Sequence, residues 1–456
     1  MNSFGQKKSR VLLCAYACSP DQGSEESVGW DTATGLSGLG HQVVVLTRSD
    51  EAALSKNRAS SLPSHQQPEF ISFDLPRPLR ALLGRLGKLG VEAGYYFWLR
   101  KARREVRRLH AQYDFTSCQH VTYARYWMPS PVSVLDIPFV WGPVGGGETI
   151  PTGLKTDFSL SGRLFENIRD TMRHLGEKSD LTRMNAVAST IGLANTRETA
   201  ERMQALGAKN VELINSAALS DRDIAALDRP HVKSDTIVFA SIGRLLEWKG
   251  FHLGLEAFAR ANMKNASYLI VGSGPQRQRL QQEAFRLGIA LDVVFIDSIP
   301  RDELLTRMQS VNALVHPSMH ESGGYVVLEA MASRIPVICL EAGGPSLFVD
   351  ETCGYVAPVS SRDEAIDYMA NAMQQICEEP ANRTAKGESA RSRVIERFSM
   401  AVKLNKLSVL HTAYASPQSK RTESIPFTSS NKAASERAAS RPAKSSGDHM
   451  IARECA

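Results

Sequence analysis

Residues 312–332 read Asn-Ala-Leu-Val-His-Pro-Ser-Met-His-Glu-Ser-Gly-Gly-Tyr-Val-Val-Leu-Glu-Ala-Met-Ala. The apolar segment 313–315 predicts a short strand that ends at Pro317, and residues 328–332 predict a helix soon afterwards. The polar loop between them carries Glu321 and two glycines. In an open parallel sheet, ligands bind beyond the carboxyl ends of the strands, where helix N-terminal amides can meet an anion. This loop is therefore expected to face a cleft.

The composition is that of a folded globular protein. The chain has 456 residues, of which 43% are hydrophobic and 22% charged, and this length suits about two to four domains. No apolar run approaches ~18 residues, so no membrane-spanning helix is expected. The seven cysteines form no CxxC pair or finger-like spacing, which predicts reduced thiols and no structural zinc. The net charge of +6 suits an anionic ligand or membrane surface without requiring nucleic acid.

Strand-like segments alternate with loops and helical segments along both halves of the chain. They include residues 11–17, 41–47, 186–194 and 211–214 in the first half, and 237–242, 268–271, 293–296 and 336–340 in the second. This alternation predicts two Rossmann-like α/β domains with parallel sheets. No GxGxxG motif follows the first strand, which argues against a dinucleotide-binding dehydrogenase. A closing helix is expected over residues 391–410.

Three further loops at predicted strand ends have ligand-binding chemistry. One contains Gly23, and a second has the run Gly145, Gly146, Gly147, Glu148, in which a backbone without side chains can approach a ligand closely. The third carries Arg244 and Lys249. A guanidinium fork and an ammonium group suit a diphosphate.

These motifs together resemble the family 4 retaining glycosyltransferases, of the bacterial polysaccharide type. The resemblance is carried by Glu321 and Glu329 in a Glu-x7-Glu spacing, by Gly-Arg-Leu-x3-Lys-Gly at 243–250 and by Trp-Gly-Pro-Val-Gly-Gly-Gly-Glu at 141–148. It covers about residues 10–410 and implies a GT-B fold, in which two Rossmann-like domains face a central cleft. The implied parts are an acceptor-side domain 1–225, a nucleotide-sugar-binding domain 226–395, a helix 396–412 that crosses back, and a disordered tail 413–456.

The resemblance also implies roles for individual residues. Glu321 would orient the transferred sugar, Glu329 would bind the ribose hydroxyls, and His120 would hold a sugar hydroxyl. The residues implied at the donor are Gly23, Arg244, Lys249, Gly323 and Gly324, and those implied on the acceptor side are Gly145, Gly146, Gly147 and Glu148. Asp297 stands where the family has glycine, and Gly323 where it has phenylalanine, so the donor's sugar and base stay open.

The implied activity is retaining transfer of a sugar from a nucleotide sugar to a saccharide or lipid-linked acceptor. If Glu321 were instead the nucleophile of a hydrolase, a second carboxylate would be needed at ~5 Å. A non-catalytic nucleotide-sugar-binding protein and a nucleotide-sugar epimerase remain alternatives. The tripeptide Asp221-Arg-Asp223 resembles a metal-binding DxD but is interpreted as a helix cap, so no metal or other cofactor is expected.

Residues 76–110 interleave basic and apolar side chains, with ten Lys or Arg against two Glu. A basic amphipathic helix can lie on an anionic membrane, whereas the alternative is a core helix with a solvated basic face. Nucleic-acid binding is not expected, because no binding motif accompanies the charge. The expected location is therefore the cytoplasm, with a peripheral position on the inner face of the cell membrane.

Overall fold

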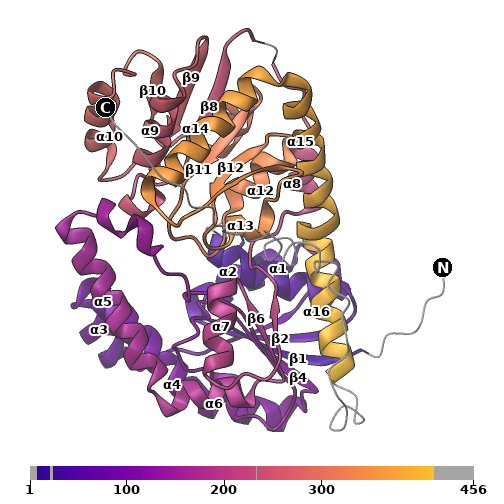
Figure 1. Ribbon diagram of the computed structural model, residues 1–456. Helices are drawn as coiled ribbons and strands as arrows, with labels where there is room; N and C mark the ends of the chain where they lie inside the picture. The colour runs from indigo at the N-terminus through magenta and orange to yellow at the C-terminus, as the bar shows by residue number, and fades with distance from the viewer. Residues whose placement is uncertain (1–7, 21–23, 233, 415–456) are drawn as a thin grey trace, which may run out of the picture. The chain divides into compact units, whose positions relative to one another are not determined.

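The computed structural model describes residues 8–20, 24–232 and 234–414. These residues form two β-sheets in which every pair of neighbouring strands is parallel, and helices flank both sheets (Figure 1). Two Rossmann-like α/β domains, as predicted, are therefore confirmed. Gly23, for which a donor-binding role was predicted, and nearly all of the predicted tail lie outside the described residues.

The N-terminal sheet has the strand order β3-β2-β1-β4-β5-β6-β7. Its strands are β1 (Arg10–Ala15), β2 (Gln42–Thr47), β3 (Glu69–Ser72), β4 (Ser117–Thr122), β5 (Phe139–Val144), β6 (Ile191–Ala194) and β7 (Val211–Leu213). All six residues of β4 and of β5 are buried, because helices cover the central strands on both faces. The direction of strand order reverses between β1 and β4, and such a switch point opens a crevice at the strand ends.

The C-terminal sheet has the strand order β10-β9-β8-β11-β12-β13. Its strands are β8 (Ile237–Ile242), β9 (Ala266–Val271), β10 (Val293–Ile296), β11 (Ala313–His316), β12 (Val337–Leu340) and β13 (Gly354–Ala357). Its switch point lies between β8 and β11. The loops that follow these two strands are those that carry Arg244 and Lys249, and Glu321.

The helices alternate with these strands along the chain. Those of the N-terminal part are α1 (Ser24–Gly38), α2 (Ser49–Ala59), α3 (Arg77–Gly84), α4 (Gly87–Tyr113), α5 (Leu160–Glu177), α6 (Asp180–Ala188), α7 (Arg197–Ala205) and α8 (Asp221–Ala226). Those that follow are α9 (Phe251–Ala261), α10 (Arg277–Arg286), α11 (Arg301–Met308), α12 (Tyr325–Ala332), α13 (Pro345–Phe348), α14 (Arg362–Glu378), α15 (Pro380–Arg393) and α16 (Met400–Tyr414). The basic stretch 76–110 is thus helical, in α3 and α4.

The prediction of one strand over residues 186–194 is wrong for the first part of this segment. Helix α6 continues to Ala188, and β6 begins only at Ile191. The helix is held by its polar side chains: Thr182 donates to the carbonyl of Trp127 at 3.1 Å, and Asn185 donates to that of Met128 at 2.9 Å. The apolar residues at the end of α6 resemble a strand in the sequence, and the predicted strand therefore began too early.

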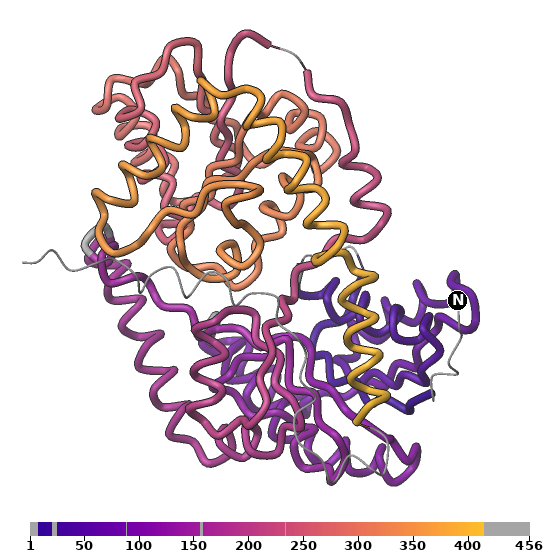
Figure 2. Tube along the Cα trace, turned by 45° about the vertical axis from the view of Figure 1, so that its right-hand side comes forward, coloured from indigo at the N-terminus to yellow at the C-terminus, as the bar shows by residue number. Residues whose placement is uncertain are grey.

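The closing helix predicted over 391–410 is interrupted. Helix α15 begins much earlier, a π-helical turn η5 spans Val394–Phe398, and α16 starts at Met400. The break occurs because the backbone pairs with Leu219, whose N–H donates to Phe398 at 3.1 Å and whose carbonyl accepts from Met400 at 2.7 Å. Helix α16 then runs beside the elements of the N-terminal sheet (Figure 2), so closely to α1 that a Cβ on Gly35 would meet Leu404 at 2.2 Å.

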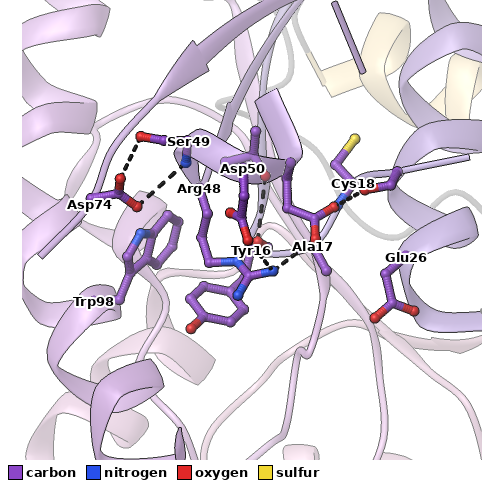
Figure 3. A network of polar contacts seen from close by, with 12 residues as sticks. Tyr16, Ala17, Cys18, Glu26, Arg48, Ser49, Asp50, Asp74 and Trp98 are labelled. Atoms are coloured by element: carbon purple, nitrogen blue, oxygen red, sulfur yellow. Dashed lines mark hydrogen bonds and ion pairs between the residues drawn. The ribbon is translucent and has the colours of Figure 1, made fainter. Parts of the chain in front are cut away.

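Polar contacts fix the loops at the ends of β1 and β2 (Figure 3). The guanidinium of Arg48 lies 4.8 Å from the centre of the Tyr16 ring and pairs with Asp50 at 3.4 Å. It also binds Glu51 at 2.7 Å, and Glu51 in turn accepts from the N–H of Cys18 at 3.0 Å. These contacts hold the chain that leads into the cleft end of the sheet.

Helix α16 brings a buried histidine to the N-terminal sheet. His411 is fully buried and contacts Gln119 Oε1 at 2.9 Å and Ser117 Oγ at 3.0 Å. Burial, with a smaller contribution from His41, lowers the pKa of His411 to about 3. The imidazole is therefore neutral in the folded protein at pH values where the unfolded chain has bound a proton.

We predict that this histidine makes the protein less stable as pH falls below about 6.5, its pKa in the unfolded chain. Between that value and about 3 the unfolded state binds one more proton at this site, which lowers the free energy of unfolding by up to about 1.4 kcal/mol per pH unit. Urea denaturation of His411→Gln at several pH values should show a shallower loss than the wild type. His65→Gln, at an exposed position, is the matched control, and equal slopes in all three proteins would contradict the assignment.

Candidate functional site

A cavity of about 1020 Å³ lies at the two switch points, with walls from both parts of the chain. From the N-terminal part it is lined by Glu25, Leu89, Val91, Glu92, Tyr123, Ala124, Arg125, Trp127, Pro143, Gly145, Gly146, Glu148, Phe165, Ile168, Arg169, Met172, Asn195 and Ser216. From the C-terminal part it is lined by Ile242, Gly243, Lys249, Leu304, His320, Glu321, Ser322, Gly323, Gly324, Tyr325, Val326 and Glu329. Its volume is at the upper end of the range for pockets that bind small molecules and cofactors.

The loop after β11 places a carboxylate beside two basic groups. Glu321 forms an ion pair with Lys249, and His316 Nε2 lies 3.5 Å from Glu321 Oε2. Lys249 and Glu321 each keep 18% of their side chains exposed, whereas His316 keeps 1%. Burial raises the pKa of Glu321, but the contact with His316 and the charge of Lys249 outweigh it and lower the pKa to about 2. The cavity therefore presents a permanent carboxylate next to an ammonium group.

Glycines allow these two loops to approach each other. Gly250, which follows Lys249, has φ of 65°, and a Cβ there would meet the carbonyl oxygen of Pro317 at 2.0 Å. The loop after β12 packs against the same segment, since the N–H of Gly344 donates to the Glu321 carbonyl at 2.8 Å. A larger residue at either position would push Glu321 away from Lys249. This close packing is the structural reason for glycine after the lysine.

Glu329 lies on α12, in the wall of the cavity. It accepts from Arg301 Nη2 at 2.9 Å, and the same nitrogen lies 3.1 Å from Asp223. Burial raises the pKa of Glu329, and Arg301 opposes this effect. Gly324 forms the N-terminal boundary of α12 with φ of 116°, so it can turn the chain from the glutamate loop into the helix. Gly323 precedes it in the lining of the cavity.

The glycine loop after β5 forms the opposite wall. Glu148, 1% exposed, accepts through Oε1 from the hydroxyls of Thr196 and Thr199, both at 3.1 Å. Its Oε2 accepts from the N–H of Gly146 at 3.0 Å, and Arg173 donates to its carbonyl at 2.6 Å. Glu148 thus orders the loop through bonds within the protein, and Gly145 and Gly146 reach the cavity beside it.

Some of the predicted site residues do not line the cavity. His120 is 1% exposed within β4, where burial lowers its pKa to about 4 and its Nε2 lies 3.4 Å from the Tyr95 hydroxyl. The N–H of Gly147 points to Thr199 at 3.0 Å. Arg244 is exposed on the loop after β8, and no ion pair of its guanidinium is present among the described residues. The roles predicted for these three residues stay predictions.

Helix α5 is a part of the site for which no element was predicted. Its N-cap residue is bound to the loop after β8, because Glu247 accepts from the N–H of Ser159 at 2.7 Å and from its hydroxyl at 2.9 Å. The ring of Phe165 stacks on that of Trp248 at 6.2 Å. Apolar residues at helical spacing from 160 to 175 would have indicated the helix. No comparable signal in the sequence placed Trp127 or Asn195 at the cavity.

The Asp221-Arg-Asp223 tripeptide lies in the first turn of α8, as the cap interpretation predicted. Ser220 is the N-cap residue, and its hydroxyl accepts from the N–H of Asp223 at 3.1 Å. Within residues 8–20, 24–232 and 234–414, no group of three or more His, Cys, Asp or Glu side chains is arranged to hold a metal ion. In the same part of the chain, no helix is both long and apolar enough to cross a bilayer.

The comparisons with known proteins agree with this geometry. Residues 223–393 match the family described as Glycosyl transferases group 1. We call residues 223–393 the group 1 region, after the family that they match. This region includes Lys249, Glu321 and Glu329.

Two curated relatives extend the match. The lipopolysaccharide core biosynthesis glycosyltransferase LpsE of Rhizobium meliloti (strain 1021) is 30% identical over 210 residues, which are 45% of this chain and 59% of LpsE. The alpha-D-kanosaminyltransferase of Streptomyces kanamyceticus is 25% identical over 345 residues, which are 72% of this chain and 85% of that protein. The matched segment thus spans about three fifths of LpsE.

Solved structures show the same fold. The lipopolysaccharide outer core galactosyltransferase WaaB, in its apo form, superposes with a TM-score of 0.60 at 14% identity, over 89% of this chain and 99% of WaaB. HepE of Anabaena, in complex with UDP and glucose, superposes with a TM-score of 0.53 at 16% identity, over 89% of this chain and 100% of HepE. The described residues therefore share the two-domain fold of these two proteins.

Proposed function

We propose that this protein is a retaining glycosyltransferase that moves a sugar from a nucleotide sugar to a saccharide or lipid-linked acceptor in the synthesis of cell-surface polysaccharide. The carrying observation is the cavity in which Lys249, Glu321 and Glu329, all within the group 1 region, face the glycine loop of the other domain. The names of LpsE and WaaB support a role in surface polysaccharide, and HepE, bound to UDP and glucose, supports a nucleotide-sugar donor.

The proposed mechanism balances two charges. Breaking the bond between the anomeric carbon and the diphosphate builds negative charge on the leaving group and positive character on the sugar. Lys249, together with Arg244 when it turns inward, stabilises the diphosphate, and the amides near Gly323 and Gly324 add donors at the start of α12. Glu321, ionised above about pH 2, faces the sugar, and Glu329 binds the ribose hydroxyls. His120 is proposed to hold a sugar hydroxyl.

Turnover across a panel of UDP-, GDP- and ADP-sugars tests the function. Release of the nucleotide with a glycosylated acceptor supports transfer, whereas conversion of the donor alone would indicate an epimerase. Binding of a donor without any turnover would indicate a non-catalytic nucleotide-sugar-binding protein.

We predict different kinetic effects for the two cavity glutamates. Glu329→Ala should raise the donor KM by about tenfold, because ribose contacts are shared by the ground and transition states. Glu321→Ala should instead lower kcat by about tenfold or more, because its contact with the sugar changes during the reaction. Steady-state kinetics with the best donor of the panel distinguish the two. Glu303→Ala, an acid on α11 outside the cavity lining, is the matched control, and wild-type kinetics in both cavity variants would refute the roles.

Transfer is proposed to need no divalent cation, because Lys249 and Arg244 can balance the diphosphate charge. Activity should survive excess EDTA, and Lys249→Ala or Arg244→Ala should reduce kcat/KM by about two orders of magnitude if each contact is worth ~3 kcal/mol. Asp221→Ala is the control and should remain active. Loss of activity in EDTA that Mg²⁺ or Mn²⁺ restores would show that metal independence is wrong.

Peripheral binding to the inner face of the cell membrane is proposed from α3 and α4. Exposed apolar side chains such as Leu82, which is 58% exposed, alternate there with exposed Arg77, Arg80 and Arg104. The protein should sediment with anionic vesicles in low salt and be released as salt rises, because screening weakens attraction to anionic lipid. Equal sedimentation with neutral vesicles at high salt would contradict the electrostatic contribution.

A further inference from the structure

Part of the cavity lining is an apolar wall that comes from two helices. Leu89 and Val91 belong to the start of α4, and Phe165, Ile168 and Met172 belong to α5. All five side chains line the cavity, yet each is between 39% and 75% exposed. Exposed apolar side chains that share one concave surface are a mark of a binding site.

The charged residues within this wall are already paired. Arg125 forms two hydrogen bonds with Glu92, one of them at 3.0 Å, and Arg169 pairs with Glu166 at 2.5 Å. Both guanidiniums are thus ion-paired with a carboxylate of the same part of the chain, although Nε of Arg169 has no hydrogen-bond partner among the described residues. The binding capacity that the wall leaves unused is mainly hydrocarbon surface.

Another part of the same lining is polar. Glu321 and Lys249 contribute to it from the C-terminal part of the chain, and Glu148 and Asn195 from the N-terminal part. A ligand that fills the whole cavity thus needs a polar end near Glu321 and an apolar end between α4 and α5. A free oligosaccharide matches only the first requirement, because its hydroxyl groups would lose water against the apolar wall.

We infer that the acceptor is an amphiphile whose saccharide enters the cavity while its hydrocarbon chain lies between the start of α4 and α5. This inference rests on the proposed transferase function and selects the lipid-linked acceptor over the free saccharide. The apolar surface continues beyond the cavity on α5, where Leu160, Leu164 and Leu175 are 84%, 61% and 66% exposed.

The test measures binding of n-alkyl β-D-maltosides to the full chain by isothermal titration, below their critical micelle concentrations. Hexyl, octyl and decyl maltosides share one head group, so differences among them report the chain alone. We expect affinity to rise by up to about fourfold for each methylene that the wall buries. Methyl maltoside should bind at least tenfold more weakly than the decyl compound.

Two double variants locate the chain. Phe165→Ser with Ile168→Ser should abolish the dependence on chain length and weaken decyl maltoside by about tenfold or more. Leu160→Ser with Leu175→Ser removes equally exposed apolar residues of α5 that do not line the cavity, and it should leave binding unchanged. Circular dichroism of both pairs checks that the helix is retained.

Three outcomes would overturn the inference. The first is equal affinity for all members of the maltoside series. The second is an equal loss of affinity in both double variants. The third is that sedimentation shows the Phe165→Ser, Ile168→Ser variant to differ from the wild type in oligomeric state while its affinity for decyl maltoside is unchanged. The proposed function fails separately, since the donor panel measures turnover without an alkyl chain. Transfer from a nucleotide sugar to methyl and decyl glycosides with equal kcat/KM would keep the function and refute the amphiphilic acceptor.

Discussion

The ion pair between Lys249 and Glu321 is the interaction on which the cavity depends. Each partner comes from a loop at a different strand of the C-terminal switch point, so the pair forms only when β8 and β11 lie side by side and the backbone at Gly250 touches Pro317. Both side chains are largely buried, and loss of one partner in such a pair typically costs about 3–5 kcal/mol. The carboxylate and the ammonium are thereby held ready in a fixed relation.

The N-terminal domain forms the opposite wall of the cavity, and there hydrogen bonds around a buried carboxylate replace the ion pair. There both carboxylate oxygens of Glu148 accept hydrogen bonds, one from two threonine hydroxyls and one from a backbone N–H, and Arg173 donates to the carbonyl of Glu148. One wall thus contains the Lys249–Glu321 ion pair at the cavity surface. The other contains the Glu148 carboxylate, whose oxygens bond to donors within the protein. This division leaves charged side chains on the C-terminal wall of the cavity, while the N–H groups of Gly146 and Gly147 on the other wall are bonded within the protein.

The sequence allowed the fold to be predicted wherever a strand, a polar loop and a helix followed one another closely. That Lys249 and Glu321 lie at one cleft followed from the rule that parallel strands end at one edge, but the ion pair between them, 72 residues apart, was not predicted. The sequence does not indicate that Arg301 lies beside Glu329, since that contact depends on how α11 packs. Nor could it show that His120 is enclosed by Tyr95, because burial arises from tertiary contacts and not from local pattern.

Helix α5 contacts both domains of the protein. Its first turn is tied to Glu247 of the C-terminal part, while Arg173, thirteen residues beyond Leu160, grips the glycine loop of the N-terminal part. A helix is stiff along its axis, because its backbone bonds run in that direction. Any hinge rotation of one sheet against the other must either break the bonds at Glu247 or move the glycine loop with it. Helix α5 therefore links the loop that carries Lys249 to the glycine wall of the cavity through contacts at both of its ends.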